Sequence, residues 1–293
     1  MTVVVKHRQG YNSTLLSQTK RLLCRLDLKA RKSLGQHFLI DREVLAKVVE
    51  AAGLAPGDVV VEVGPGLGVL TEGLAAKAGR VIAVELDDRL ATILKQRLAS
   101  AGNVTVVSGD ILKLEPSALI GDKSIEYKVV ANLPYYITSA VIRHFLEAWL
   151  KPRLMVLMVQ KEVAEAIVAE PGRMSLLSVS VQFYGRPEIA SYAPAGCFYP
   201  QPEVDSAILK IDVYSQQAVA VDDIDGFFQL VRAGFTASRK QLVNSLALGL
   251  GLPKSEVVLL LGTAGIMCQR RAETLALEEW QWLWQVLRKR QKW

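Results

Sequence analysis

The sequence has few cysteines and no long apolar run, and both shortages restrict the kind of protein it can be. Its three cysteines, Cys24, Cys197 and Cys268, are an odd number, lie far apart and form no CxxC pair. This argues against a disulfide framework and a zinc site, and it predicts three reduced thiols that serve packing. No stretch reaches the roughly 18 apolar residues of a membrane helix, and the N-terminus is not apolar enough for a signal peptide. We therefore expect a cytoplasmic protein with no membrane contact and no metal site.

Charged residues are also modest in number, at 22%, against 51% hydrophobic residues. This composition is typical of a compact globular protein, and 293 residues suffice for one large core with a smaller appended unit. The 35 basic residues outnumber the 29 acidic ones and give a net charge of +6. A basic balance favours a polyanionic partner, although charge alone does not identify one.

Short β-branched runs alternate with helical patterns through the middle of the chain. The runs occupy 59–63, 80–86, 103–107, 127–132 and 153–159. Such alternation predicts an α/β fold in which a parallel sheet carries helices on both faces. Ligands of these sheets bind beyond the carboxyl ends of the strands, so the residues that follow each run are the candidate site residues.

Three regions are predicted from the pattern. Residues 1–30 form an N-terminal extension, whose segment 11–30 places leucines among Lys and Arg as in an amphipathic surface helix with a basic face. Residues 31–214 form the sheet domain. After a polar linker the chain becomes helical, so residues 215–293 are predicted to form a small all-helical C-terminal domain.

The first strand leads into a glycine turn at Gly64, Gly66 and Gly68. Glycines at a strand-to-helix turn let the backbone approach a nucleotide closely. A dinucleotide fingerprint requires another glycine at position 69, where this chain has Val69, so the pattern disfavours an NAD-type oxidoreductase. The GxGxG spacing, preceded by Glu62, suits a cofactor without phosphates.

Acidic residues follow the next two strands. Glu85 is placed to accept hydrogen bonds from ribose hydroxyls, and Asp110 to accept one from an adenine amino group. An acidic residue after a strand is usually a turn former or a helix cap. Consecutive strands that each end in a ligand for one adenosine nevertheless predict an adenosine-containing cofactor.

The fourth strand ends in the tetrapeptide NLPY, residues 132–135. The amino group of adenine is a poor nucleophile, so an enzyme that methylates it needs hydrogen-bond acceptors and an aromatic face. Asn132 offers a side-chain oxygen, Pro134 biases Leu133 toward an extended conformation that aims its carbonyl, and Tyr135 offers a ring for stacking. A strand-ending turn followed by a core tyrosine is the alternative interpretation of the tetrapeptide alone.

Taken together, ordered motifs along the chain resemble the KsgA/RsmA family of small-subunit (16S) rRNA adenine dimethyltransferases. This family is related to the eukaryotic ribosomal dimethyltransferases and the erythromycin-resistance methylases. The motifs are RKSLGQHFL (31–39), EVGPGLGVLT (62–71), VSGD (107–110), NLPYYITSAVI (132–142), MVQKEVAEAI (158–167), FYPQPEVDSAIL (198–209) and FTASRKQLVNSL (235–246).

The resemblance implies a Rossmann-like methyltransferase with a mostly parallel seven-stranded sheet, S-adenosyl-L-methionine as cofactor, and a C-terminal unit that helps grip rRNA. It implies that Phe198 stacks on the target adenine opposite Tyr135. The substrate would be two adjacent adenosines near the 3′ end of 16S rRNA in the small subunit or its precursor, and the enzyme a monomer. The implied cofactor contacts are His37, Leu39, Gly64, Gly66, Glu85, Asp110 and Asn132.

Two related functions remain as alternatives at this point. One is a 23S rRNA methyltransferase of the erythromycin-resistance type, which the segments KSLGQHFL and FYPQPEVDSAI disfavour. The other is a ribosome assembly factor that acts mainly by binding, which the complete NLPY motif disfavours.

Overall fold

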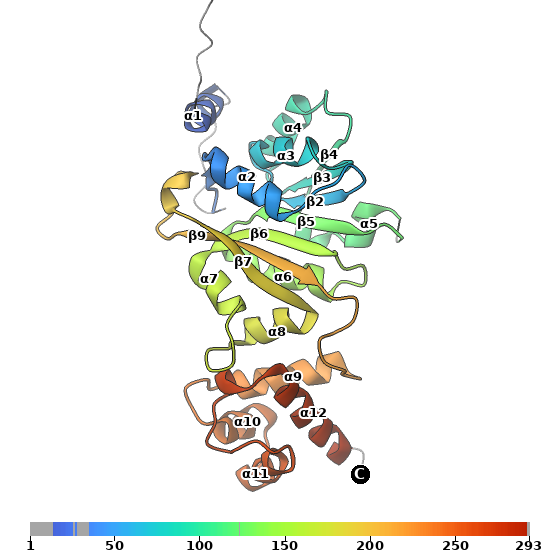
Figure 1. Cartoon of the computed structure of the whole chain (residues 1–293), viewed down its shortest axis with the longest axis vertical. Coiled ribbons are helices and arrows are strands. Elements are labelled where there is room, and N and C mark those ends of the chain that lie inside the picture. The colour runs from blue at the N-terminus through green and yellow to red at the C-terminus, as the bar shows by residue number, and fades with distance from the viewer. Residues whose placement is uncertain (1–13, 26, 28–34, 123, 292–293) are drawn as a thin grey trace, which may run out of the picture.

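The computed structural model describes residues 14–25, 27, 35–122 and 124–291 (Figure 1). The helices are α1 (Leu15–Arg25), α2 (Arg42–Ala51), α3 (Val69–Ala75), α4 (Asp88–Arg97), α5 (Pro116–Ile120), α6 (Thr138–Glu147), α7 (Lys161–Ile167), α8 (Leu176–Tyr184), α9 (Ile224–Phe235), α10 (Leu242–Leu250), α11 (Lys254–Thr263) and α12 (Leu277–Gln291). The strands are β1 (Phe38–Leu39), β2 (Val59–Val63), β3 (Arg80–Glu85), β4 (Val104–Ser108), β5 (Tyr127–Asn132), β6 (Leu154–Gln160), β7 (Gly185–Ala193), β8 (Phe198–Tyr199) and β9 (Ser206–Val213).

A sheet of seven strands forms the framework, in the order β4-β3-β2-β5-β6-β9-β7. Strands β4, β3, β2, β5 and β6 pair in parallel, whereas β9 runs antiparallel to both β6 and β7. The strand β9 therefore reverses direction within an otherwise parallel sheet. The predicted α/β fold with a mostly parallel seven-stranded sheet is confirmed.

Helices cover both faces of this sheet because alternate residues of its strands are apolar on both sides. In β2, Val61 belongs to a large cluster with α6 and α8, while Val60 belongs to a second cluster with α2 and α3. Every residue of β2 is buried. Burial on both faces explains why the central strands read as continuous apolar runs in the sequence.

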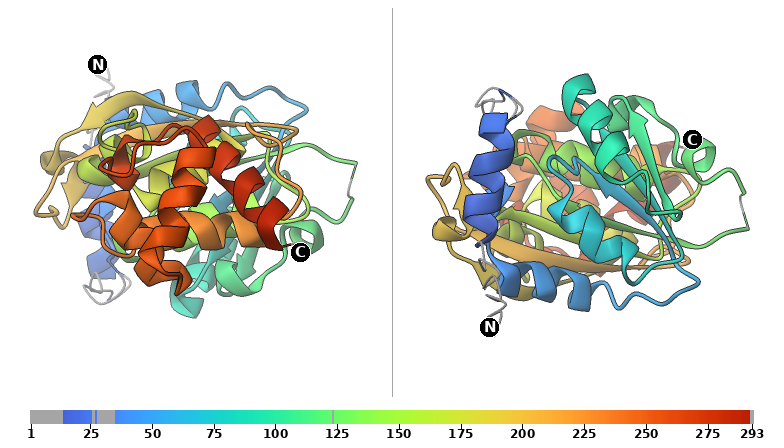
Figure 2. Two further views of the ribbon diagram at one scale, coloured as in Figure 1. Left: turned by 90° about the horizontal axis from the view of Figure 1, so that it is seen from below. Right: turned by 90° about the horizontal axis from the view of Figure 1, so that it is seen from above.

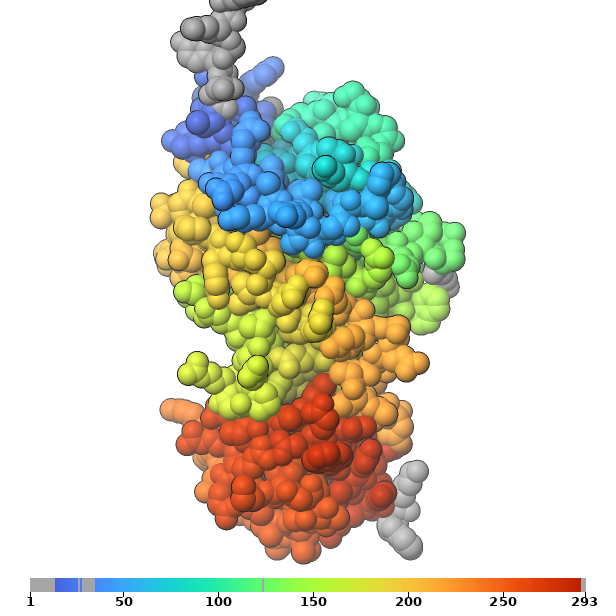
Figure 3. Space-filling view, viewed as in Figure 1, coloured from blue at the N-terminus to red at the C-terminus, as the bar shows by residue number. Residues whose placement is uncertain are grey.

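The C-terminal helices pack below the sheet on α8, as seen in Figure 1 and, from below, in Figure 2. Phe227 and Phe228 of α9 contact the rings of Phe183 and Tyr184 of α8 at centroid distances between 5.2 and 6.1 Å. The apolar cluster continues from the sheet into α9–α12, although the outlines of the two parts remain separate in Figure 3. The predicted boundaries at residues 31 and 215 stay a prediction.

Helices α10 and α11 follow each other closely in the chain and are both rich in apolar residues. No single helix of the described chain has the length and hydropathy to cross a membrane. Among the described residues, only α10 and α11 taken together have that length and hydropathy, and the two helices are bent by 118° to each other. The segment 254–263 was not predicted as a separate helix, because its apolar residues form the run VVLLL instead of recurring at helical spacing.

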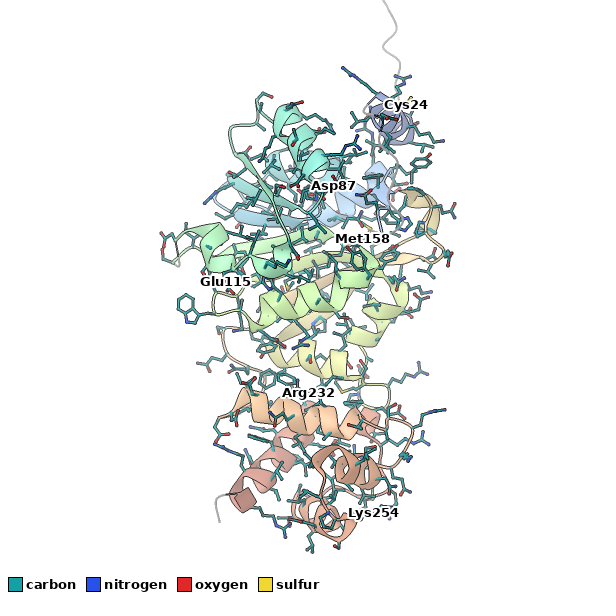
Figure 4. The ribbon with its side chains drawn as sticks, turned by 180° about the vertical axis from the view of Figure 1, so that it is seen from behind. Cys24, Asp87, Glu115, Met158, Arg232 and Lys254 are labelled. Carbon is teal, nitrogen blue, oxygen red and sulfur yellow. The ribbon has the colours of Figure 1, made fainter. Side chains whose placement is uncertain are left out.

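The predicted amphipathic helix near the N-terminus is present as α1, and Lys20, Arg21 and Arg25 are exposed on it. Its Leu23 packs in a small cluster whose other buried members are Phe38, Leu67 and Leu90. The three cysteines are free. The prediction that all three serve packing is wrong for Cys24, which lies on the exposed face of α1 because only the opposite face meets the protein (Figure 4).

One buried ion pair fixes the end of the sheet opposite the glycine turn. The Lys128 ammonium donates to the Asp58 carboxylate at 2.9 Å and to the carbonyls of Ala52 and Gly53 at 3.0 and 2.8 Å. Lys128 is 3% exposed. It therefore joins β5 to the loop that leads from α2 into β2.

Replacing Lys128→Met should lower the free energy of unfolding by about 3–5 kcal/mol, because it leaves a partly buried carboxylate without its closest cation. Arg153 provides the matched control, since it lies 3.8 Å from the same carboxylate but is 54% exposed. Arg153→Met should cost less than about 1 kcal/mol. Urea unfolding at neutral pH measures both, and equal losses would contradict this role for Lys128.

Candidate cofactor and substrate cavity

A cavity of about 330 Å³ lies at the carboxyl ends of β2, β3, β4 and β5. Small-molecule sites commonly have volumes of roughly 300–1,000 Å³. All the predicted site residues except Phe198 contribute to its wall, including segments far apart in the sequence. Those residues are His37, Leu39, Gly64, Gly66, Glu85, Asp110, Asn132, Leu133, Pro134 and Tyr135.

The glycine turn forms the floor between β2 and α3. Gly64, Gly66 and Gly68 have φ angles of 66°, 56° and 81°, a region that side-chain-bearing residues adopt at a cost. A Cβ atom at Gly66 would also lie 3.2 Å from the Phe38 ring. Glycine is therefore required here by both backbone conformation and space.

Glu85 ends β3 beside this turn and is 6% exposed. Its Oε2 accepts the Gly66 N–H at 2.9 Å, and its Oε1 accepts the Asp87 N–H at 2.9 Å. Burial raises the pKa of this carboxyl, while the two N–H donors act in the opposite direction. Each oxygen has a second lone pair, so the fixed carboxyl can still accept from two neighbouring hydroxyls.

Asp110 follows β4 on the same edge of the sheet. One of its oxygens, Oδ1, accepts the Leu112 N–H at 3.1 Å and so caps a short 3-10 turn. Its side chain is 32% exposed. Asp110 therefore caps the turn that follows its strand, as acidic residues in this position often do. Its carboxylate also lies in the cavity wall, where it can accept further hydrogen bonds.

Asn132 at the end of β5 is oriented by the segment before β1. Its Nδ2 donates to the His37 carbonyl at 3.0 Å, which leaves the side-chain oxygen as the free end of the amide. The His37 Nδ1 lies 2.7 Å from the Pro200 carbonyl, and because that carbonyl only accepts, Nδ1 carries the hydrogen. His37 thus joins the NLPY and FYPQP segments.

Tyr135 begins the 3-10 turn Tyr135–Ile137 and is half-buried. Its ring stacks on the His37 ring at a centroid distance of 5.7 Å. Its hydroxyl lies 2.8 Å from the Ser206 Oγ, and burial raises the pKa of the phenol. The phenol therefore stays neutral, and the ring is held from two sides beside the cavity.

Phe198 does not reach the cavity wall. It is 2% exposed, pairs with Leu39 across the short β1–β8 ladder, and packs in the apolar cluster on the α2 face of the sheet. In this structure the ring is a packing element, so the predicted stacking on adenine stays a prediction.

Among the wall residues that were not assigned from the sequence, Glu62 and Tyr136 have side chains with chemistry of interest. Glu62 of β2 was noted only as preceding the glycines, and Tyr136, 59% exposed, follows the tetrapeptide. Glu62 stands out in the sequence as the only charged residue of the run VVVEV, which was the signal available. Within the described segments, no group of three or more His, Cys, Asp or Glu side chains is arranged to hold a metal.

Comparison with protein families gives one match over most of the chain. The model described as ribosomal RNA adenine dimethylase matches residues 27–288. A ribosomal RNA small subunit methyltransferase A from Dehalococcoides mccartyi (strain ATCC BAA-2266 / KCTC 15142 / 195) is 55% identical over 272 residues, covering 92% of each chain. The protein of the same name from Moorella thermoacetica is 45% identical, covering 89% of this chain and 94% of its own.

Solved structures with the same fold include two methyl- or dimethyl-transferring enzymes that cover most of the chain. A dimethyladenosine transferase from Plasmodium falciparum superposes with a TM-score of 0.74 at 26% identity, over 87% of this chain and 98% of its own. The 23S rRNA methyltransferase ErmE superposes with a TM-score of 0.68 at 30% identity, over 86% of this chain and 99% of its own. The similarity therefore includes the C-terminal helices as well as the sheet.

Proposed function

The chain belongs to the ribosomal RNA adenine dimethylase family, and on that premise we propose that it dimethylates two adjacent adenosines near the 3′ end of 16S rRNA. Dimethylation of adenine in ribosomal RNA, with S-adenosylmethionine as methyl donor, is the activity of this enzyme. What we propose beyond this activity is its substrate, the small ribosomal subunit or its precursor.

The relatives support that choice. The two small subunit methyltransferases reported above are 55% and 45% identical over about nine-tenths of the chain, whereas the 23S rRNA enzyme is 30% identical. Substrate choice within one fold depends on RNA contacts. The higher identity therefore favours the small subunit over the 23S alternative.

The donor set of the cavity fits the cofactor. Glu85, held by two backbone N–H groups, would accept from the ribose hydroxyls, and Asp110 would accept from the adenine amino group. Gly64 and Gly66 would let the cofactor approach the backbone closely, and His37 and Leu39 would contact it from another part of the wall. When bound, the cofactor supplies an electrophilic methyl group on a positively charged sulfur.

Asn132 and Leu133 would prepare the nucleophile. Because the Asn132 amide nitrogen is engaged by His37, its oxygen would accept one hydrogen of the target amino group, and the Leu133 carbonyl the other. Two acceptors draw the amino nitrogen away from conjugation with the ring and aim its lone pair at the methyl group. The main contribution of these residues is therefore orientation.

Tyr135 would hold the flipped base on the face of its ring that His37 does not cover. Unstacking a base costs a few kcal/mol, which stacking on an aromatic ring offsets by about 1–3 kcal/mol. Pro134 would fix the direction of the turn that presents this ring. Phe198 would add a second ring by turning out of its packing with Leu39.

The C-terminal helices would grip the rRNA. Arg239 and Lys240 are exposed in the turn between α9 and α10, on the helical part that the family match includes. Basic side chains at such a turn can contact phosphates without reading sequence. We propose further that the enzyme acts as a monomer in the cytoplasm.

The substrate proposal is tested by transfer of a radiolabelled methyl group from S-adenosylmethionine to small ribosomal subunits that lack the modification. We expect label in small subunits and its recovery as dimethyladenine near the 3′ end of 16S rRNA. Large subunits serve as the control. Equal or greater labelling of large subunits would refute the proposed substrate.

Asn132→Ala and Tyr135→Ala should each reduce methyl transfer by about 100-fold or more, with unfolding close to that of the wild type, because both side chains serve the substrate. Tyr135→Phe is the matched control: it removes the contact with Ser206 but keeps the ring, and it should retain most of the activity. Single-turnover rates and urea unfolding measure the effects. Full activity in either alanine variant would exclude the proposed site.

Phe198→Leu separates the two roles of that residue. If the ring stacks on the base, methyl transfer should fall by about 10-fold or more while the free energy of unfolding changes by less than about 1.5 kcal/mol. We expect this result. Wild-type activity in a stable Phe198→Leu enzyme would leave Phe198 with packing alone.

A further inference from the structure

Glu62 is an enclosed carboxyl that the mechanism above does not use. It is 1% exposed, lies in the wall of the cavity, and its Oε2 has no hydrogen-bond partner among the described residues. A carboxylate that is removed from water without a donor or a cation is strongly disfavoured. The group must therefore be neutral until a positive charge comes close to it.

The strand order shows which part of the cofactor comes close. Along the edge of the sheet stand Asp110 after β4, Glu85 at the end of β3, Glu62 on β2 and Asn132 at the end of β5. Neighbouring strands are about 4.8 Å apart, so these groups span about 14 Å. If adenine and ribose bind at the first two groups and the target amino group at the last, as proposed above, the positively charged sulfur would lie between them, over β2.

The charged groups around Glu62 do not neutralise it. Glu85, on the adjacent strand, adds a negative charge. Lys128 lies on the same face of the sheet, two residues back in register, but its ammonium is bonded to Asp58. The charged residues of α2 and α3 are exposed on the outer sides of those helices, and they are Arg42, Glu43, Lys47, Glu50 and Glu72.

We propose that Glu62 senses the charge of the cofactor: it holds a proton in the empty or product-loaded cavity and releases it to solvent when the sulfonium donor binds. This inference rests on the cofactor placement proposed above. Burial raises the pKa of Glu62 to about 8. The Thr71 hydroxyl lowers this pKa, and the negative charge of Glu85 raises it further. An adjacent cation lowers such a pKa by about 1–3 units.

The proton balance then follows the reaction. The S–CH₃ bond breaks with its electron pair remaining on sulfur, the N–CH₃ bond forms, and the amino nitrogen loses a proton to solvent. The sulfur of the product is neutral, so Glu62 takes a proton back from solvent. The ionised Glu62 would thus bind the methyl donor more tightly than the product. After methyl transfer, the neutral Glu62 would no longer hold the cofactor by its charge.

Calorimetric titration of the full-length protein with S-adenosylmethionine and S-adenosylhomocysteine tests this directly. In buffers of different ionisation enthalpy near about pH 7, we expect the donor to release about 0.4–0.9 proton and the product to release clearly less. Because the free carboxyl has the higher pKa, affinity for the donor should rise with pH up to about 8 and then level off.

Glu62→Gln should abolish the difference in proton release between donor and product binding. It should also weaken donor binding by about 10- to 100-fold and leave product affinity nearly unchanged. Glu72→Gln, an exposed change on α3, is the matched control and should behave as the wild type. Urea unfolding verifies that both variants fold. Equal proton release for the two ligands, or unchanged release in Glu62→Gln, would overturn the proposal. Failure of the wild type to bind either ligand would instead refute the cofactor placement.

Discussion

The constraint on which the site depends is the parallel pairing of β4, β3, β2 and β5, because it brings four carboxyl ends to one edge. Three of these ends carry a polar group that backbone contacts hold in place, and the fourth strand carries Glu62, whose Oε2 has no hydrogen-bond partner among the described residues. Glu85 is held by two N–H donors and Asn132 by the His37 carbonyl. A one-strand change in this order would separate the groups that we propose to act on the cofactor and the target base.

The sequence could predict those features that depend only on residues close to one another in the chain, such as strand ends and glycine turns. The strand ends at Glu85, Asp110 and Asn132 were identifiable because each follows an apolar run, and the glycines because no other residue fits the turn. The position of β9 between β6 and β7 could not be predicted, since it depends on which edge remains open after the parallel strands have paired. The same applies to domain limits, which adjacent sequence does not determine.

Phe198 and Glu62 show the limit more sharply. The burial of Phe198 depends on its pairing with Leu39, a residue far away in the chain, and no periodicity near residue 198 reveals it. Glu62 could be noticed as a charged residue in an apolar strand, but its unpartnered oxygen is a property of the folded cavity. Sequence patterns thus identified most of the residues that come together in the cavity wall. The structure adds which of their atoms already form hydrogen bonds within the protein.

Helix α1 lies before the segment that the family match covers, yet its Leu23 is buried with Leu67 of the glycine turn and with Phe38. These residues form part of the cavity wall. Loss of α1 would uncover the side chains of Phe38 and Leu67, so a helix that lies outside the family match contributes to the packing behind the cavity wall.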